Sequence, residues 1–227
     1  EAYGSKELAE VIQPAIDLAK DGFILDEDLA GQFKRRLESF LNYPASLKVF
    51  SVDGEPYEPG DRFSQPDLAG TLERIKLAGK SGFYAGETAD LIVAEMKNGG
   101  GMISARDLED YESKWRRPIM GEYRGYKVIS MPPPSSGGVL LTQMLNMLEP
   151  YELGKLGAGS SEVIHLMIEA ERRAYADRAE HLGDSDFYNV PIEMLTSKDY
   201  ARERFADFDP NKASVSADIF AGVAARE

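Results

Sequence analysis

The chain has 227 residues, of which 43% are hydrophobic and 29% charged, and it contains no run of 18 apolar residues. This composition is typical of a globular protein and gives no sign of a transmembrane helix. The formal net charge of −13 argues against a nucleic-acid partner, because binding to phosphates requires a basic surface. The chain has no cysteine, which excludes disulfide bonds, thiolate catalysis and cysteine-bound metals. Its first residues resemble an internal stretch of a longer protein and carry no recognisable signal peptide.

The first half of the chain is predicted to be mainly helical. Pro14 lies inside the first apolar pattern, so this helix is expected to be kinked or to begin late, near Gln13. Residues 47–52 alternate between apolar and polar side chains before an Asp-Gly pair, which predicts a strand and a turn. Ser104 and Asp107 have the spacing of a capping box at the start of a short helix. Apolar residues recur at helical spacing in residues 8–19, 25–41, 66–75 and 87–96.

The second half is predicted to combine two strands with several helices. Residues 119–131 are rich in tyrosine and β-branched side chains around Arg124-Gly125, which predicts two short strands joined by a turn. Ser160 or Ser161 is expected to cap the longest helix. Residues 211–227 are small, polar and poorly periodic, as in a linker or a disordered tail. Helices are predicted over residues 139–148, 162–181, 191–195 and 198–205.

The expected fold class is α+β with helices dominating. The predicted strands are fewer than the roughly five or six of an average sheet. They therefore either form a small sheet beneath the helices or complete a sheet that another part of a longer protein supplies.

The segment Pro132–Gly138, with sequence PPPSSGG, carries the strongest local signal of a ligand site. Glycines let the backbone approach a ligand, and the N–H groups of a following helix start can face an anion. However, the segment lacks the GK[ST] of a phosphate-binding P-loop and the G-x-S-x-G of a serine nucleophile elbow. The alternative is that Ser135 or Ser136 simply caps the helix.

The two histidines, His165 and His181, do not form a recognisable catalytic or metal motif. Their separation of sixteen positions differs from the i, i+4 pair of a helical zinc site. His165 has apolar neighbours and is expected to be hydrogen-bonded and partly buried. A Ser-His-Asp triad assembled in three dimensions stays open as a less favoured alternative.

The charged residues of the longest helix allow two interpretations. Glu169 and Arg173 have the spacing of a weak ion pair on a solvated face. Alternatively, Glu171, Tyr175 and Arg178 point inward as a buried polar network. The stretch at residues 183–186, GDSD, follows the helix and is expected to form a turn, because it lacks the pattern of a calcium-binding loop.

Three stretches together resemble the γ-glutamyltranspeptidase family of glutathione hydrolases. They are GGGMISARDLEDY, RPIMGEYRGYKVISMPPPSSGG and EAERRAYADRAEHLGDSDFYNVP, in this order along the chain. The resemblance covers residues 1–210, which are expected to form a single, incomplete domain of the large subunit. Residues 211–227 have no firm match and are expected to lead toward a self-cleavage site.

The resemblance implies an enzyme made as one precursor that cuts itself into two subunits. Family members are N-terminal nucleophile hydrolases with an αββα sandwich, in which a threonine at the new N-terminus attacks the γ-glutamyl amide. The implied substrates are glutathione and other γ-glutamyl compounds, with no cofactor and no metal. The implied partners are the N-terminal segment of the large subunit and the small subunit, and the implied location is periplasmic or extracellular.

The catalytic threonine and the carboxylate-binding arginine of the family lie outside residues 1–227, so no catalytic residue is assigned here. Ser135, Ser136, Gly137 and Gly138 are the candidates for lining the substrate site of the complete protein, by analogy with the family fold. The fragment alone is expected to be inactive. Two alternatives are a non-catalytic helical binding module and a serine hydrolase that uses Ser135 or Ser136.

Overall fold

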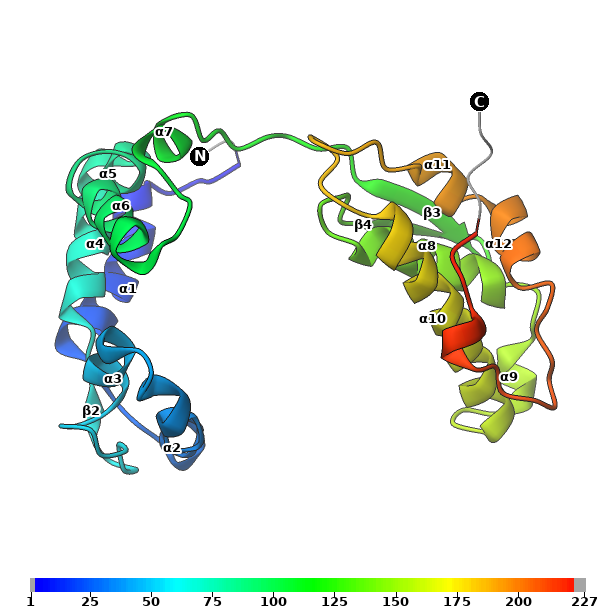
Figure 1. Cartoon of the computed structure of the whole chain (residues 1–227), viewed down its shortest axis with the longest axis horizontal. Coiled ribbons are helices and arrows are strands. Elements are labelled where there is room, and N and C mark those ends of the chain that lie inside the picture. Colours follow the sequence, from blue (N-terminus) through cyan, green and yellow to red (C-terminus); the bar gives the residue numbers. More distant parts are fainter. Residues whose placement is uncertain (1–2, 223–227) are drawn as a thin grey trace. The chain divides into compact units, whose positions relative to one another are not determined.

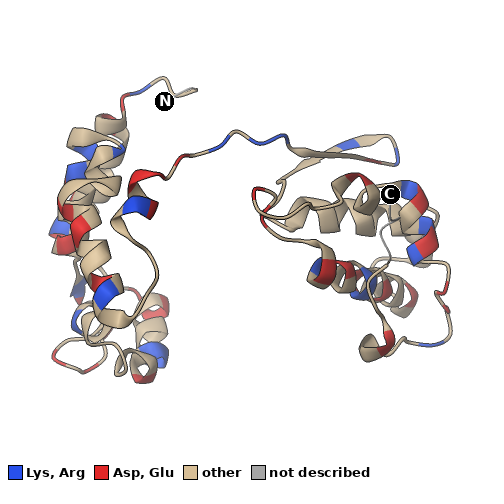
Figure 2. Cartoon of the chain, turned by 45° about the horizontal axis from the view of Figure 1, so that its top comes forward, with Lys and Arg blue, Asp and Glu red and all other residues tan. Residues whose placement is uncertain are grey.

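The computed structural model describes residues 3–222, and these form two compact units, residues 3–113 and 114–222. Helices dominate both units (Figure 1), in agreement with the predicted α+β class. Basic and acidic residues are interspersed on the helices of each unit (Figure 2). None of the helices in residues 3–222 has the length and apolar character needed to cross a membrane.

The first unit is built on the pairing of two long helices. Helix α1 (Leu8–Asp21) packs on α4 (Pro66–Ala78). Pro66 occupies the first position of α4, where a backbone N–H would form no hydrogen bond within the helix, so proline is tolerated there. The prediction that α1 begins late is wrong, because the helix continues through Pro14. The other elements of this unit are β1 (Phe23–Ile24), α2 (Glu27–Phe40), α3 (Pro44–Phe50), β2 (Arg62–Phe63), α5 (Ser81–Tyr84), α6 (Gly86–Gly99) and α7 (Ala105–Glu109).

An aromatic cluster holds α2 and α3 against the short β1–β2 ladder. Phe63 of β2 is buried, and the rings of Phe33, Phe50 and Tyr57 lie 5.1–5.9 Å from it. The predicted strand at residues 47–52 is wrong: Pro44 begins a helix there, and Phe50 faces this cluster. The capping box of Ser104 and Asp107 is confirmed at the start of α7, and Gly100 ends α6 in a left-handed conformation.

The second unit contains a β-hairpin and a layer of helices. Strands β3 (Ile119–Tyr123) and β4 (Tyr126–Ser130) pair antiparallel, and no third strand joins them within residues 3–222. Arg124 and Gly125 both have positive φ, as a tight turn between twisted strands requires, so the predicted hairpin is confirmed. The helices are α8 (Gly137–Leu148), α9 (Leu153–Leu156), α10 (Ser161–His181), α11 (Ile192–Leu195) and α12 (Lys198–Arg204), followed by the 3-10 turn η1 (Ser216–Asp218).

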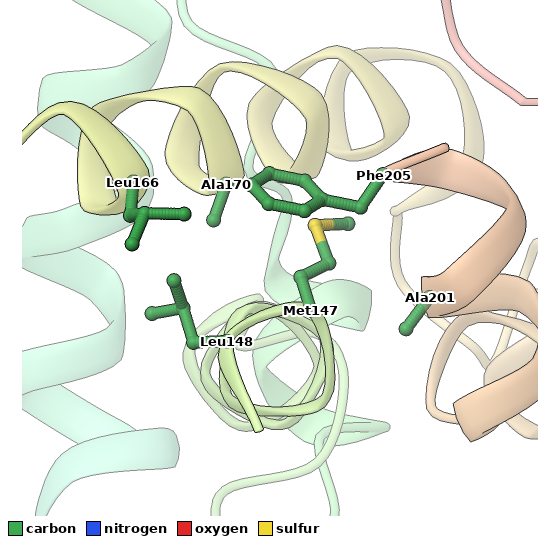
Figure 3. Packing of buried hydrophobic residues seen from close by; sticks show 6 residues of the cluster. All are labelled: Met147, Leu148, Leu166, Ala170, Ala201 and Phe205. Carbon is green, nitrogen blue, oxygen red and sulfur yellow. The ribbon is translucent and has the colours of Figure 1, made fainter. Parts of the chain in front are cut away.

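The core of the second unit lies where α8, α10 and α12 meet. The side chain of Met147 on α8 reaches between Ala170 of α10 and Ala201 of α12, and the ring of Phe205 lies over it (Figure 3). Ala170 and Ala174 are completely buried, which lets the backbones of α8 and α10 approach closely. One face of the β-hairpin packs on α8, whereas Met120 and Ile129 pair across the strands on the exposed face.

The division into residues 1–210 and a tail of 211–227 stays a prediction. Of the predicted tail, residues 211–222 are described, and residues 223–227 lie outside the described part of the chain. The described tail residues hydrogen-bond to side chains of α10 and α12.

Candidate functional site

The PPPSSGG segment connects the end of β4 to the start of α8. Pro133 is buried and is followed by a cis peptide bond to Pro134. Ser135 is exposed, and Ser136 is half-buried. The segment therefore presents its hydroxyl groups at the surface of the second unit while its proline arm is fixed inside.

Gly138 is required by a close approach between two backbone segments. A Cβ atom at this position would lie 2.2 Å from the carbonyl oxygen of Met131, which no side chain can tolerate without backbone movement. The neighbouring Gly137 is different, because its Cβ would make ordinary contact, 3.6 Å from the Ser135 hydroxyl. Of the two glycines, only Gly138 is therefore required by packing, and this close contact determines the direction in which α8 runs after the hairpin.

The serines are not helix caps of the expected kind. Ser136 occupies the N-cap position of α8, but its backbone is already helical, and its side chain makes no capping hydrogen bond. Its hydroxyl instead accepts a hydrogen bond of 3.1 Å from Nε of Arg178 on α10. Ser135 accepts a long hydrogen bond of 3.4 Å from the Gly137 N–H. The capping interpretation is therefore wrong for Ser136.

Neither histidine activates these serines. Nε2 of His165 hydrogen-bonds to the carbonyl oxygen of Asp209 at 2.9 Å, and Nε2 of His181 to that of Gly222 at 2.7 Å. A base for serine must lie within hydrogen-bond reach of the hydroxyl, and these contacts direct both rings elsewhere. Within residues 3–222 the geometry therefore gives no support to a serine hydrolase.

What lies beside the serines is a guanidinium group and the start of a helix. Arg178 is exposed and donates to Ser136, and the N–H of the next residue, Gly137, donates to the Ser135 hydroxyl. Such a surface favours an anionic group over a cationic one. The placement of Ser135, Ser136, Gly137 and Gly138 in a substrate site stays a proposal.

The most unusual chemistry of the unit lies on the buried face of α10. Glu169, Arg173 and Asp177 follow one another at four-residue intervals, and each side chain is 1% exposed. The prediction of a solvated Glu169–Arg173 pair is therefore wrong. The alternative inward network is also wrong, because Glu171, Tyr175 and Arg178 are exposed.

The sequence contained a signal that would have identified the correct face. Leu166, Ala170 and Ala174 form an apolar row at four-residue spacing, and small residues in such a row mark where a helix packs closely on a neighbour. Glu169, Arg173 and Asp177 flank this row on the same side of the helix.

Glu169 is ionised in spite of its burial. Its carboxylate accepts a hydrogen bond of 2.7 Å from Nη1 of Arg173 and one of 2.9 Å from the Ser214 N–H. Burial by itself raises the pKa of Glu169, but the bonds from Ser214 and Arg173 outweigh it and lower the pKa to about 2. Arg173 also donates to Asp207 at 2.7 Å, so its charge is shared between two carboxylates.

Asp177 forms the second half of the buried network. Oδ1 lies 3.0 Å from Nη2 of Arg204 and accepts the Gly222 N–H at 2.8 Å, while Oδ2 accepts from the amide of Gln143. Tyr200 is buried beside this carboxylate, and burial together with the charge of Asp177 raises the pKa of its hydroxyl. The two buried carboxylates of α10, Glu169 and Asp177, are thus fully paired, which is the condition for burying charge.

The acidic residues after α10 form a turn, as predicted. The N–H groups of Phe187 and Tyr188 donate to the carbonyl of Asp184, and Asp186 forms an ion pair of 2.8 Å with Arg116. Hydrogen bonds from Arg116 and Lys114 lower the pKa of Asp186 to about 2. Among residues 3–222, no group of three or more histidine, aspartate or glutamate side chains is placed to bind a metal ion.

Comparison with solved structures places this architecture among the γ-glutamyltranspeptidases. The γ-glutamyltranspeptidase of Helicobacter pylori superposes with a TM-score of 0.92 at 46% identity, over 97% of this chain and 64% of that chain. The helix-dominated α+β fold is therefore that of an N-terminal nucleophile hydrolase segment, as the resemblance implied.

The chain belongs to the gamma-glutamyltranspeptidase family, whose model matches residues 1–225. It is 46% identical over 221 residues to the glutathione hydrolase proenzyme of Escherichia coli strain K12, which covers 97% of this chain and 38% of that protein. It is also 40% identical over 211 residues to the acylase ACY 1 proenzyme of Pseudomonas sp. strain SE83, covering 93% of this chain and 38% of that protein. The chain thus spans about two fifths of the length of the curated relatives that it matches.

Alanine substitutions at Gly137 and Gly138 distinguish the close backbone approach, which concerns Gly138 alone, from the effect of alanine on helix propensity, which concerns both. Gly138→Ala is expected to lower the free energy of unfolding by about 1–3 kcal/mol, because the new methyl group collides with the Met131 carbonyl. Gly137→Ala, the control, is expected to change it by less than about 1 kcal/mol. Urea denaturation of the chain measures both, and equal effects would contradict the close-approach explanation.

The buried Glu169 carboxylate is expected to make stability depend on pH. Since its pKa is lowered on folding, its contribution is complete above the unfolded value near 4.5 and is lost as the pH falls toward 2. As the pH falls from about 5 to below about 2, protonation of Glu169 should lower the free energy of unfolding by on the order of 3 kcal/mol. Glu169→Gln should be less stable near pH 7 and should lose less on acidification. Parallel pH profiles for both proteins would refute this assignment.

Proposed function

We propose that the complete protein containing residues 1–227 hydrolyses or transfers the γ-glutamyl group of glutathione and related γ-glutamyl amides. The observation that carries this proposal is the match to the glutathione hydrolase proenzyme of E. coli, at 46% identity over 97% of the chain. The match of residues 1–225 to the family model supports it, as does the superposition of 97% of the chain on a γ-glutamyltranspeptidase with a TM-score of 0.92.

The reacting group in this proposal is a threonine outside residues 1–227. The precursor cuts itself and exposes that threonine, whose free α-amine serves as the base for attack on the γ-glutamyl amide. Water or an amino acid then takes the γ-glutamyl group from the acyl-enzyme. The relatives' description as proenzymes supports a precursor that requires processing.

The present chain contributes framework to that enzyme. Its β-hairpin exposes Met120 and Ile129 on one face and has unpaired edges within residues 3–222. An exposed apolar face and open edges of this kind favour further strands from the same precursor. The N-terminal segment of the large subunit and the small subunit are therefore the proposed partners, in an αββα sandwich.

A second candidate is an acylase that acts on an amide other than a γ-glutamyl one. The 40% identity to the acylase ACY 1 proenzyme of Pseudomonas favours it over unrelated activities. The two candidates share the fold and the proposed nucleophile and differ in the acyl group that they accept.

Activity assays on the fragment and the complete precursor test the proposal directly. The chain of residues 1–227 is expected to release no p-nitroaniline from γ-glutamyl-p-nitroanilide, because it lacks the nucleophile. The complete precursor is expected to release it, and exchanging its threonine for alanine should remove the activity. Turnover by the fragment would contradict the assignment of the nucleophile.

An acyl-amide substrate without the γ-glutamyl group serves as the second arm of the assay. Activity on it alone would favour the acylase candidate. A complete precursor that cleaves neither substrate but binds γ-glutamyl compounds would instead support the non-catalytic binding module.

We also propose that Ser135, Ser136, Gly137 and Gly138 lie beside the substrate site of the complete enzyme. The exposed hydroxyl of Ser135 and the contact between Ser136 and Arg178 support this, since both suit a carboxylate-bearing substrate. Ser136→Ala in the complete enzyme is expected to raise KM for the anilide about two- to tenfold with little change in kcat. Ser161→Ala, at an exposed serine of α10, is the control, and equal KM values for both variants would exclude the role.

A further inference from the structure

Residues 209–222 run alongside α10 in the same direction as the helix. The contacts between them follow the order of both sequences, so the segment is held along most of the helix. Over the helical residues 165–181 this corresponds to a path of roughly 24 Å, at about 1.5 Å per residue. The contacts join His165 to Asp209, Glu169 to Ser214, Arg172 to Ser216, and both Asp177 and His181 to Gly222.

The downstream end of this segment is held from several sides. The Gly222 N–H donates to Oδ1 of Asp177 at 2.8 Å, and its carbonyl oxygen lies 2.7 Å from Nε2 of His181. Nη2 of Arg204 donates to the carbonyl of Phe220 at 2.9 Å. We call Asp177, His181, Tyr200 and Arg204 the tail seat.

Gly222 fits the tail seat only because it has no side chain. A Cβ atom there would lie 2.2 Å from the hydroxyl oxygen of Tyr200 and 2.7 Å from Cδ of Arg204. Tyr200 is buried and cannot move aside freely. The seat therefore fixes the backbone of residue 222 more closely than a surface contact would.

We propose that the tail seat positions the chain following Gly222 for self-cleavage of the precursor. This inference rests on the proposed function, because it assumes that the precursor is processed. Self-cleavage consumes one water molecule and converts one peptide bond into a new carboxylate and a free α-amine. Its rate depends on holding the reacting groups of one chain in a fixed geometry, and the tail seat holds the backbone at Phe220 and Gly222 through three hydrogen bonds.

The two histidines of α10 provide a matched pair for testing this role. Each ring donates through Nε2 to a backbone carbonyl of the same segment, at 2.9 Å for His165 and 2.7 Å for His181. They differ in which end of the segment they hold. If the seat positions the downstream chain, His181 should matter for self-cleavage and His165 much less.

The experiment follows the conversion of the full-length precursor into two subunits over time, by denaturing gel electrophoresis. His181→Ala is expected to slow self-cleavage about two- to tenfold, because this is the change in rate that the loss of one hydrogen bond produces. His165→Ala is expected to cleave at nearly the rate of the unmodified precursor. Gly222→Ala is expected to slow cleavage at least as much as His181→Ala, because it displaces the segment from the seat.

A two-chain form of the protein distinguishes positioning from folding. When both subunits are produced as separate chains, with the threonine already at its N-terminus, self-cleavage is not needed. The His181→Ala and Gly222→Ala variants of this form are expected to match the unmodified form in activity. An equal loss of activity in the two-chain form would overturn the proposal, since the seat would then act on folding or assembly.

The outcomes also separate this inference from the function on which it rests. If the unmodified precursor cleaves itself and both variants cleave at the same rate, the tail seat has no positioning role. If the unmodified precursor neither cleaves itself nor acts on γ-glutamyl amides, the proposed function is wrong and the inference falls with it.

Discussion

The arrangement of the second unit depends on the three buried ionisable residues of α10. Glu169, Arg173 and Asp177 lie in one row, and removing such groups from water costs several kcal/mol for each ion unless it is paired. Their partners come from different parts of the chain: Gln143 of α8, Arg204 of α12, Asp207, and the N–H groups of Ser214 and Gly222. Each of these elements must take one position relative to α10 for the row to be satisfied.

The apolar contacts and the ionic row have separate roles. Ala170 and Ala174 allow α8 and α10 to approach, and Met147 and Phe205 fill the space between them. This burial supplies the favourable free energy, since buried ion pairs contribute little net stability compared with apolar packing. The ionic row instead penalises any arrangement in which a carboxylate is left without its donor, so it selects among the ways in which the same helices could pack.

The sequence predicted the elements whose signals are local. Ser104 with Asp107, and Arg124 with Gly125, determine structure through contacts within a few residues, and both predictions were confirmed. The strand predicted at residues 47–52 was wrong, because alternation over six positions does not distinguish a strand from a short helix, and Pro44 starts a helix there. For the ionic row, the small residues of α10 mark the buried face, but the partners could not be predicted, because they lie up to 45 positions away and only the fold brings them together.

The same distinction applies to the PPPSSGG segment, which belongs to the resemblance to the family and supplies no nucleophile. Its constraint is geometric. A Cβ atom on Gly138 would lie 2.2 Å from the carbonyl oxygen of Met131, so only glycine lets α8 start at this point. The Ser136 hydroxyl accepts a hydrogen bond from Arg178, and within residues 3–222 both histidines bond elsewhere, so its chemistry is that of a positioned hydroxyl. A sequence can be recognisable because the backbone permits few alternatives there. In this chain the PPPSSGG segment contacts Arg178 of α10, and the tail seat includes Asp177, the preceding residue of the same helix. Both the hydroxyl-bearing loop and the tail seat are therefore attached to a single rigid element.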